Sequence, residues 1–347
     1  MMKNKQAVFW GICFFVLSIL LGLALKPIVH FFSSGENVFF RESEITEMED
    51  LQQGEYLFKG WQKKNRQRAL VVILDNTVYG RPQAGLEKAD VIVEFPVEGG
   101  LTRLAAIIST DNLDLLGPIR SARSYFVDLA KEYRGILIHA GGSTEALQKI
   151  AAEQVDHFDE IYGGTQVSGC FWRFPDRERP YNLFTSSDVL RQTAKKLNLP
   201  RSPQPPKRTM LTSETEIKGE NAKTITVFYA HKDSMANFVY QQERQVFERF
   251  TADNEPYLTY AGEHLQVANV IVQIVPYCYT DGDGHLQLIM HGEGQALIFR
   301  QGKVVEGVWR KKPDGFTEFV DSHGKTIPLI EGPTWISVVP RGMRIDY

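Results

Sequence analysis

Short apolar runs alternate with polar or amphipathic stretches along residues 68–199. Each run is only a few residues long and is bounded by turn residues, a pattern typical of buried strands. The runs lie at residues 69–74, 91–95, 101–109 and 135–139. Residues 119–126 are expected to open one helix, and a second helix is expected to begin after Ser143. Strands that alternate with helices predict an α/β or α+β N-terminal domain over residues 68–199.

The pattern changes beyond residue 208 to short strands at regular spacing, separated by turn residues. The predicted strands lie at residues 225–231, 238–250, 270–279, 286–291, 295–300, 304–310, 316–320 and 335–339. They predict a mainly-β C-terminal domain over residues 209–347, built as a sandwich or a barrel. Between the two domains, residues 200–208 contain four prolines and are expected to form an extended linker.

Residues 7–25 contain no charged residue and are long enough to cross a bilayer as a helix. Lys3 and Lys5 precede this run and acidic residues follow it, so the positive-inside rule places the N-terminus in the cytoplasm. We expect a cytoplasmic tip and transmembrane anchor at residues 1–32 and an extracytoplasmic stalk at 33–67. The expected location is the cell membrane, crossed once, with the bulk of the chain outside. A cleaved signal peptide is the alternative, but the run is long for one and ends without a small-x-small cleavage site.

Charge and cysteine content exclude several classes of protein. The formal net charge is −3, which gives no global positive field, so nucleic acid is not an expected partner. The three cysteines have no metal-binding spacing, and neither a metal nor a cofactor is expected. Cys170 and Cys278 lie in different predicted domains, and the sequence leaves open whether they pair. The sequence contains no complete serine-elbow, metal-binding-helix or phosphate-loop motif.

Two arginines single out one segment as the candidate site. Arg120 and Arg123 fall in the predicted first turn of the helix at residues 119–126 and are expected to share one helical face. Positive charge there is unfavourable, because the N-terminal end of a helix already carries a partial positive charge. Either acidic side chains within the protein or a bound anion must offset it, and the sequence leaves both explanations open.

A second helix start follows at Gly141, Gly142 and Ser143, where backbone amides can approach a ligand and Ser143 can cap the helix. The alternative is a tight strand-to-helix turn that binds nothing. His139, at the end of the preceding strand, is a candidate acid or base, or else a hydrogen-bonded core residue. The binding candidates are Glu98, Arg103, Arg120, Ser121, Arg123, His139, Gly141, Gly142, Ser143, Arg173 and Asn182. The alternative for the charged members is a structural salt-bridge network.

Several phrases of the sequence together resemble one known family. They are Arg81-Pro-Gln-Ala-Gly-Leu86, Gly117-Pro-Ile-Arg-Ser-Ala-Arg123, His139-Ala-Gly-Gly-Ser143, Arg179-Pro-Tyr-Asn-Leu183 and Thr334-Trp-Ile-Ser-Val-Val-Pro340. Over residues 66–347 the chain resembles the YerB-like lipoproteins, a bacterial family of unknown function with an N-terminal and a C-terminal part. The resemblance implies a cell-envelope protein of Gram-positive type and no established reaction.

The chain departs from that family in two places. Its anchor has the features of a transmembrane helix rather than of a lipid-linked segment. Tyr181 stands where the family phrase has a histidine, so if that histidine were catalytic, this chain would lack it.

These features predict a membrane-anchored envelope protein that binds an anionic or polar cell-wall component, or an envelope protein, through an arginine and Gly-Gly-Ser cleft. One alternative is an enzyme of envelope glycan or peptide metabolism, with His139, Glu98 and the arginines as its chemistry. Another is a purely structural interaction module. The sequence assigns no catalytic residue. Trp309 and Trp335 add one more choice, because they can form a sugar-stacking platform or pack in a core.

Overall fold

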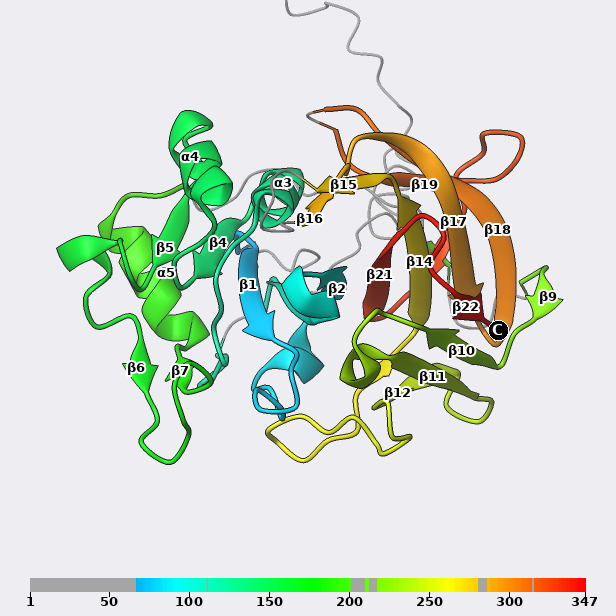
Figure 1. Ribbon diagram of the computed structural model, residues 1–347, viewed down its shortest axis with the longest axis horizontal. Coiled ribbons are helices and arrows are strands. Elements are labelled where there is room, and N and C mark those ends of the chain that lie inside the picture. Colours follow the sequence, from blue (N-terminus) through cyan, green and yellow to red (C-terminus); the bar gives the residue numbers. More distant parts are fainter. Residues whose placement is uncertain (1–66, 111, 201–209, 212–216, 280–285, 314) are drawn as a thin grey trace, which may run out of the picture. The chain divides into compact units, whose positions relative to one another are not determined.

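The computed structural model describes residues 67–110, 112–200, 210–211, 217–279, 286–313 and 315–347 (Figure 1). The predicted anchor and nearly all of the predicted stalk lie outside these residues, and so does the linker after its first proline. Within the described part of the chain, no helix combines the length and the apolar character needed to span a bilayer. Cys170 and Cys278 are both free thiols, the first buried and the second exposed.

Strands from both halves of the sequence form one sheet of 11 strands. The order is β19-β18-β17-β14-β21-β2-β3-β1-β4-β5, with β9 paired to β18 off this path. The strands are β1 (Leu70–Asp75), β2 (Val91–Pro96), β3 (Thr102–Ile108), β4 (Ile136–His139), β5 (His157–Asp159), β9 (Glu220–Asn221), β14 (Asn269–Val275), β17 (Gly292–Arg300), β18 (Lys303–Lys311), β19 (Glu318–Val320) and β21 (Thr334–Pro340).

The pairing of β2 with β21 joins the two predicted domains. The strands run parallel, with Val91 opposite Thr334 and Glu94 opposite Ser337. The N-terminal region mixes strands with helices and the C-terminal region is mainly β, as predicted. The expected separate sandwich or barrel is corrected, because six strands of the C-terminal region continue the N-terminal sheet. Hydrophobic periodicity reveals strands but not their partners, so the sequence pattern could not show this junction.

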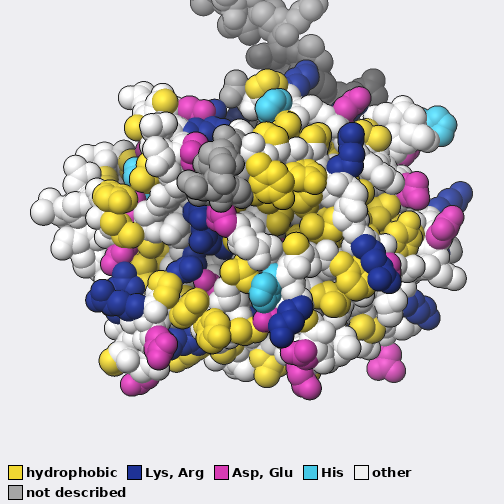
Figure 2. Space-filling model, viewed as in Figure 1, with side chains coloured by type: hydrophobic (Ala, Val, Ile, Leu, Met, Phe, Trp, Pro, Cys, Tyr) yellow, Lys and Arg dark blue, Asp and Glu magenta, His cyan; other side chains and the backbone are white. Residues whose placement is uncertain are grey.

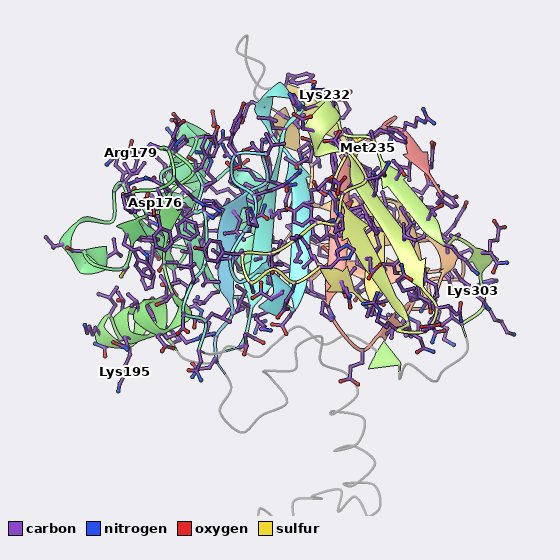
Figure 3. The ribbon with its side chains drawn as sticks, turned by 90° about the horizontal axis from the view of Figure 1, so that it is seen from below. Asp176, Arg179, Lys195, Lys232, Met235 and Lys303 are labelled. Carbon is purple, nitrogen blue, oxygen red and sulfur yellow. The ribbon has the colours of Figure 1, made fainter. Side chains whose placement is uncertain are left out.

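A second sheet has five strands in the order β13-β12-β11-β10-β22. Its strands are β10 (Thr224–Val227), β11 (Ala236–Gln241), β12 (Val246–Phe250), β13 (Gln266–Val267) and β22 (Ile345–Asp346). The remaining strands of the described residues form three pairs: β6 (Trp172–Arg173) with β7 (Leu183–Phe184), β8 (Met210–Leu211) with β20 (Leu329–Ile330), and β15 (Tyr277–Tyr279) with β16 (Leu286–Leu288). In Figure 3, Met235 marks the start of β11, and Asp176 and Arg179 mark the loop that joins β6 to β7.

Three helices and the five-stranded sheet cover the two faces of the large sheet. The helices are α3 (Ser124–Glu132), α4 (Thr144–Ala152) and α5 (Ser187–Lys196). In β1, Val71 and Ile73 share a core with residues of α3 and α4, whereas Leu70 and Val72 share a core with α5 and the five-stranded sheet. Both faces are therefore buried, which explains why the run at residues 69–74 is wholly apolar.

A buried polar network ties the loop between β12 and β13 to the end of β1. The Tyr257 hydroxyl donates to Asn76 Oδ1 at 2.6 Å, and the Asn76 amide donates to Glu94 at 2.9 Å and to Thr102 at 2.7 Å. Burial raises the pKa of Glu94, while the nearby positive charge of Arg249 opposes that rise. The network fixes the backbone next to Asp75, where the candidate site begins.

Seven strands of the large sheet run in the same direction, and the common direction of six of them positions the site. β14, β21 and β2 are mutually parallel, as are β1, β4 and β5, and both β1 and β2 run antiparallel to β3. The carboxyl ends of all six therefore lie along one edge of the sheet. Open sheets with parallel strands bind their ligands at this edge. Asp75, Glu98, His139 and Asp159 all lie at or just after the end of such a strand.

Candidate functional site

Arg120 and Arg123 do not share a helical turn, which corrects the prediction. Helix α3 begins at Ser124, and Arg123 is its N-cap residue with an extended backbone. Arg120 lies in an extended segment whose backbone groups form hydrogen bonds with neighbouring segments. Its amide donates to Ile73 O at 2.8 Å, and the Ala122 amide donates to Gly141 O at 2.9 Å. These bonds to β1 and to the loop after β4 hold the segment extended, so the helix cannot begin earlier.

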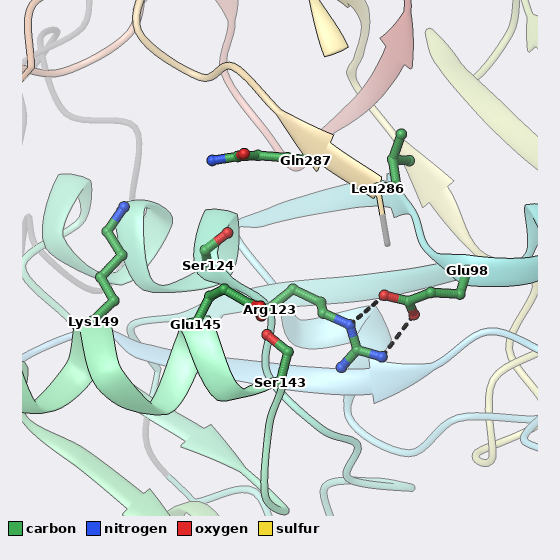
Figure 4. A pocket seen from close by; sticks show the side chains of 8 residues that line it. All are labelled: Glu98, Arg123, Ser124, Ser143, Glu145, Lys149, Leu286 and Gln287. Carbon is green, nitrogen blue, oxygen red and sulfur yellow. Dashed lines mark hydrogen bonds and ion pairs between the residues drawn. The ribbon is translucent and has the colours of Figure 1, made fainter. Parts of the chain in front are cut away.

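Both arginines have acidic partners. Arg120 Nε lies 2.8 Å from Asp75 Oδ2, and the ring of Tyr181 lies 5.5 Å from the Arg120 guanidinium. Arg123 binds Glu98 through two parallel bonds of 2.7 and 2.6 Å (Figure 4). Burial raises the pKa of Glu98, but the hydrogen bonds and charge of Arg123 outweigh burial and hold it below its usual value. Of the two explanations left open by the sequence, the acidic partners are therefore present.

Arg103, in β3, is the arginine of this cluster that has no carboxylate partner among the described residues. Its Nη1 donates to the carbonyl of Ser121 at 2.8 Å, which is the bond that Ser121 contributes. Burial, followed by the positive charges of Arg123 and Arg120, lowers the pKa of Arg103 to about 10. Of the three guanidinium groups, two are paired with carboxylates, those of Asp75 and Glu98, and that of Arg103 is not.

His139 is fully buried and holds the glycine loop in place. Its Nδ1 lies 2.8 Å from Gly141 O, and because a carbonyl can only accept, Nδ1 carries the proton. Nε2 of the neutral ring then accepts from Nδ1 of His157, 3.0 Å away. Burial lowers the pKa of His139, although the Asp159 carboxylate opposes this, so the ring stays neutral. Both ring nitrogens are occupied, which favours the core-residue interpretation of His139 over an acid or base.

The loop itself is a tight turn followed by a capped helix. Gly141 has φ of 63°, and its amide donates to Asp159 Oδ1 at 2.7 Å. At Gly142 an added Cβ would lie 3.3 Å from the carbonyl of Ala122, closer than nine in ten such contacts. Ser143 caps α4 as predicted, because its hydroxyl accepts from the amide of Ala146 at 3.3 Å.

Arg173 and Asn182 belong to a different cluster. Arg173 donates to Asn182 Oδ1 at 3.0 Å and to Glu160 at 2.9 Å. Neither residue has a hydrogen bond or ion pair with the three arginines in the described part of the chain. The structure thus gathers the predicted residues around β1, β3 and the loop after β4, and leaves this pair with β6 and β7.

A pocket of about 200 Å³ adjoins the arginine cluster, and we call it the Arg123 pocket (Figure 4). The starts of α3 and α4 both border it. It is lined by Glu98, Arg123, Ser124, Ser143, Glu145, Lys149, Leu286 and Gln287. Three of these, Glu98, Arg123 and Ser143, are sequence candidates. Leu286 and Gln287 come from β16, and no pattern in the sequence connects that strand with the arginines.

His157 was also missed, although its ring pairs with that of His139 at a centroid distance of 5.2 Å. In the sequence, only its position on a short segment after α4 could have pointed to His157. That position does not distinguish it from histidines at the surface. Across the described residues, no group of three His, Cys, Asp or Glu side chains has the arrangement needed to hold a metal ion.

Comparisons with known proteins agree with the resemblance of the sequence phrases. Two family models match, the N-terminal domain of a protein of unknown function (DUF3048) at residues 59–200 and its C-terminal domain at residues 225–336. A curated relative, "Putative lipoprotein YerB" of Bacillus subtilis (strain 168), is 28% identical over 287 residues, which cover 80% of this chain and 83% of the relative.

A solved structure is also similar. The crystal structure of the YerB protein from Bacillus subtilis superposes with a TM-score of 0.71 at 26% identity, and the match covers 82% of this chain and 95% of that chain. It supports the fold over most of the chain. The family models, the relative and the fold agree, and the chain belongs to the YerB-like family of DUF3048 proteins, whose function is unknown.

Proposed function

We propose that this protein is a membrane-associated envelope protein whose bulk lies outside the cell and binds an anionic group at the Arg123 pocket. The name of the curated relative, a lipoprotein, supports attachment to the membrane. The apolar run at residues 7–25 supports a transmembrane anchor for this chain. The ligand would be a component of the cell wall or of another envelope protein.

One observation carries the anion site: among the described residues, the positive charge of Arg103 has no paired carboxylate. A half-buried guanidinium without a carboxylate partner is costly, and an anion nearby would relieve that cost. Arg123 connects Arg103 with the pocket, because it lines the pocket and its charge lowers the pKa of Arg103. An anion in the pocket would therefore stabilise the charged forms of both arginines.

The start of α3 adds donors to the same pocket. Its N-cap residue, Arg123, makes no side-chain cap hydrogen bond, and the Phe126 amide already donates to the Arg123 carbonyl, so it is the uncapped start of the helix at Ser124 that supports an anion site. The hydroxyls of Ser124 and Ser143 line the same wall. Glu98 and Glu145 also line the pocket, so it suits one anionic group next to hydroxyls better than a dense polyanion.

Binding fits the geometry better than acid–base catalysis does. His139, the predicted acid or base, has both ring nitrogens engaged and no exposed surface. Glu98 is held in a two-bond pair with Arg123, which keeps it ionised and acceptor-only.

The test is calorimetric titration of the purified full chain with inorganic phosphate, compared between two variants. Arg103→Gln should weaken phosphate binding about ten-fold, because a positive charge close to the pocket is lost. Arg310→Gln is the matched control, since Arg310 forms an exposed pair with Glu318 far along the sheet. Equal phosphate affinity in the wild-type protein and in both variants would contradict the anion site.

A further inference from the structure

A second pocket adjoins the Arg123 pocket, at the ends of β2, β14 and β21. It has a volume of about 320 Å³, and we call it the Tyr277 groove. Tyr277, Tyr279, Gly99, Arg341 and Met343 are among its lining residues. The groove is not part of the proposed anion site. The three strands that end there are adjacent, parallel strands in the middle of the large sheet.

Two exposed tyrosine rings line the groove and make part of its surface apolar. Tyr277 and Tyr279 have exposed fractions of 42% and 65%, and their rings meet edge to face at 5.9 Å between centroids. Trp309 and Trp335, the sugar-stacking candidates in the sequence, are both fully buried and pack in the cores. Figure 2 shows a patch of hydrophobic side chains over β15 and β16. Exposed aromatic groups rimmed by polar residues mark a binding surface.

The groove also offers polar groups next to the rings. Arg341 is exposed and, within the described part of the chain, forms neither an ion pair nor a ring contact, so its five donors are available. Gly99 has φ of 70°, and a Cβ added there would meet open space, so the backbone faces the groove uncovered. An apolar ring face beside hydrogen-bonding groups matches a sugar ring, whose faces carry C–H groups and whose rim carries hydroxyls.

The groove and the Arg123 pocket share two lining residues, Glu98 and Leu286. The two pockets therefore border each other at these two residues. An extended peptide fits less well, because it needs an unpaired strand edge, and β2, β14 and β21 each have neighbours on both sides.

We infer that the Tyr277 groove binds a sugar ring of a glycan whose phosphate or carboxylate substituent occupies the Arg123 pocket. This inference rests on the proposed anion site and names the class of its ligand. The tyrosine rings stack on the sugar, Arg341 binds its hydroxyls, and the arginine cluster binds the charge.

Calorimetry of the full chain, held in a detergent without a sugar headgroup, tests the inference. The probes are inorganic phosphate and N-acetylglucosamine 6-phosphate, with lactate and N-acetylmuramic acid as the corresponding carboxylate pair. The sugar-bearing member of at least one pair should bind about ten-fold more tightly than the simple anion, since burial of one ring face adds modest binding energy. Tyr277→Ala and Tyr279→Ala should each reduce that gain and leave the affinity for the simple anion unchanged.

Tyr162→Ala is the matched control, because Tyr162 is 70% exposed and lies outside both pockets. If the simple anions bind but neither sugar gains affinity, the glycan inference is overturned and the anion site stands. A phosphoserine peptide that gains from the two tyrosines, when the sugars do not, overturns it as well. If neither phosphate nor lactate binds, the proposed anion site is overturned, and the glycan inference that rests on it is overturned with it.

Discussion

Replacing Arg120 with glutamine should destabilise the protein through the aspartate that it leaves behind. The Asp75 side chain is 2% exposed and that of Arg120 is 20% exposed, so the pair is largely shielded from water. Asp75 Oδ1 would keep its bonds from the amide and hydroxyl of Thr77 at 2.7 and 2.5 Å. Asp75 Oδ2 would lose its cationic partner, and glutamine supplies no charge to replace it.

The expected cost follows from that arrangement. Removing one partner of a buried ion pair costs about 3–5 kcal/mol, and the two surviving bonds of Asp75 place this case near about 3 kcal/mol. For a chain of this size the melting temperature should fall by about 6 °C, at roughly 2 °C per kcal/mol. The double variant Asp75→Asn/Arg120→Gln removes the stranded charge and should recover most of the loss, with a coupling energy of about 2 kcal/mol.

Urea unfolding followed by tryptophan fluorescence provides the assay, because Trp309 and Trp335 are fully buried and report on both cores. Arg103→Gln is the informative comparison. It removes one of three like charges and leaves no carboxylate unpaired, so the free energy of unfolding should stay unchanged or rise. If Arg120→Gln and Arg103→Gln shift the urea midpoint equally, the distinction drawn between a paired and an unpaired arginine is wrong.

Three further results are expected. Burial lowers the pKa of both His139 and His157 in the folded protein, so the unfolded chain binds protons more readily. The urea midpoint should therefore be highest above about pH 6.5 and should fall as the pH drops below that value. A urea midpoint that does not change with pH would contradict this. Gly141→Ala should cost about 1–2 kcal/mol in the same assay because φ there is 63°, and no loss would show that the loop relaxes. Limited proteolysis should cut within residues 200–208, yet the two fragments should elute together in gel filtration because β2 and β21 remain paired, whereas fragments that separate would show independent domains.

Local features of the fold could be predicted from the sequence because they depend on neighbouring residues. The strands at 69–74 and 91–95 match β1 and β2 within two residues, and Ser143 is the cap that its position suggested. Arg120 was misplaced into a helix because its environment is set by hydrogen bonds from β1 and from the loop after β4. Pairing partners that lie far apart in the sequence leave no trace in a hydrophobic pattern.

In the candidate site, too, the features set by neighbouring residues could be predicted, and those set by distant residues could not. The sequence indicated that Arg120 and Arg123 need negatively charged partners, because the electrostatics of a helix start can be judged from neighbouring residues alone. Their partners Asp75 and Glu98 follow different strands, and only the common direction of those strands brings them together. The Tyr277 groove was invisible for the same reason, because its tyrosines come from the opposite half of the chain.

The central position of β21 has a consequence for how the chain acquires its shape. Until residues 334–340 are available, β2 has an open edge and its apolar side chains lack part of their cover. The nascent N-terminal half would then present an unpaired, hydrophobic strand, the kind of edge that invites association between chains. Contacts between segments this distant also form slowly, because a long loop must close first. A chain truncated before β21 should therefore associate with other copies of itself more readily than the full chain does.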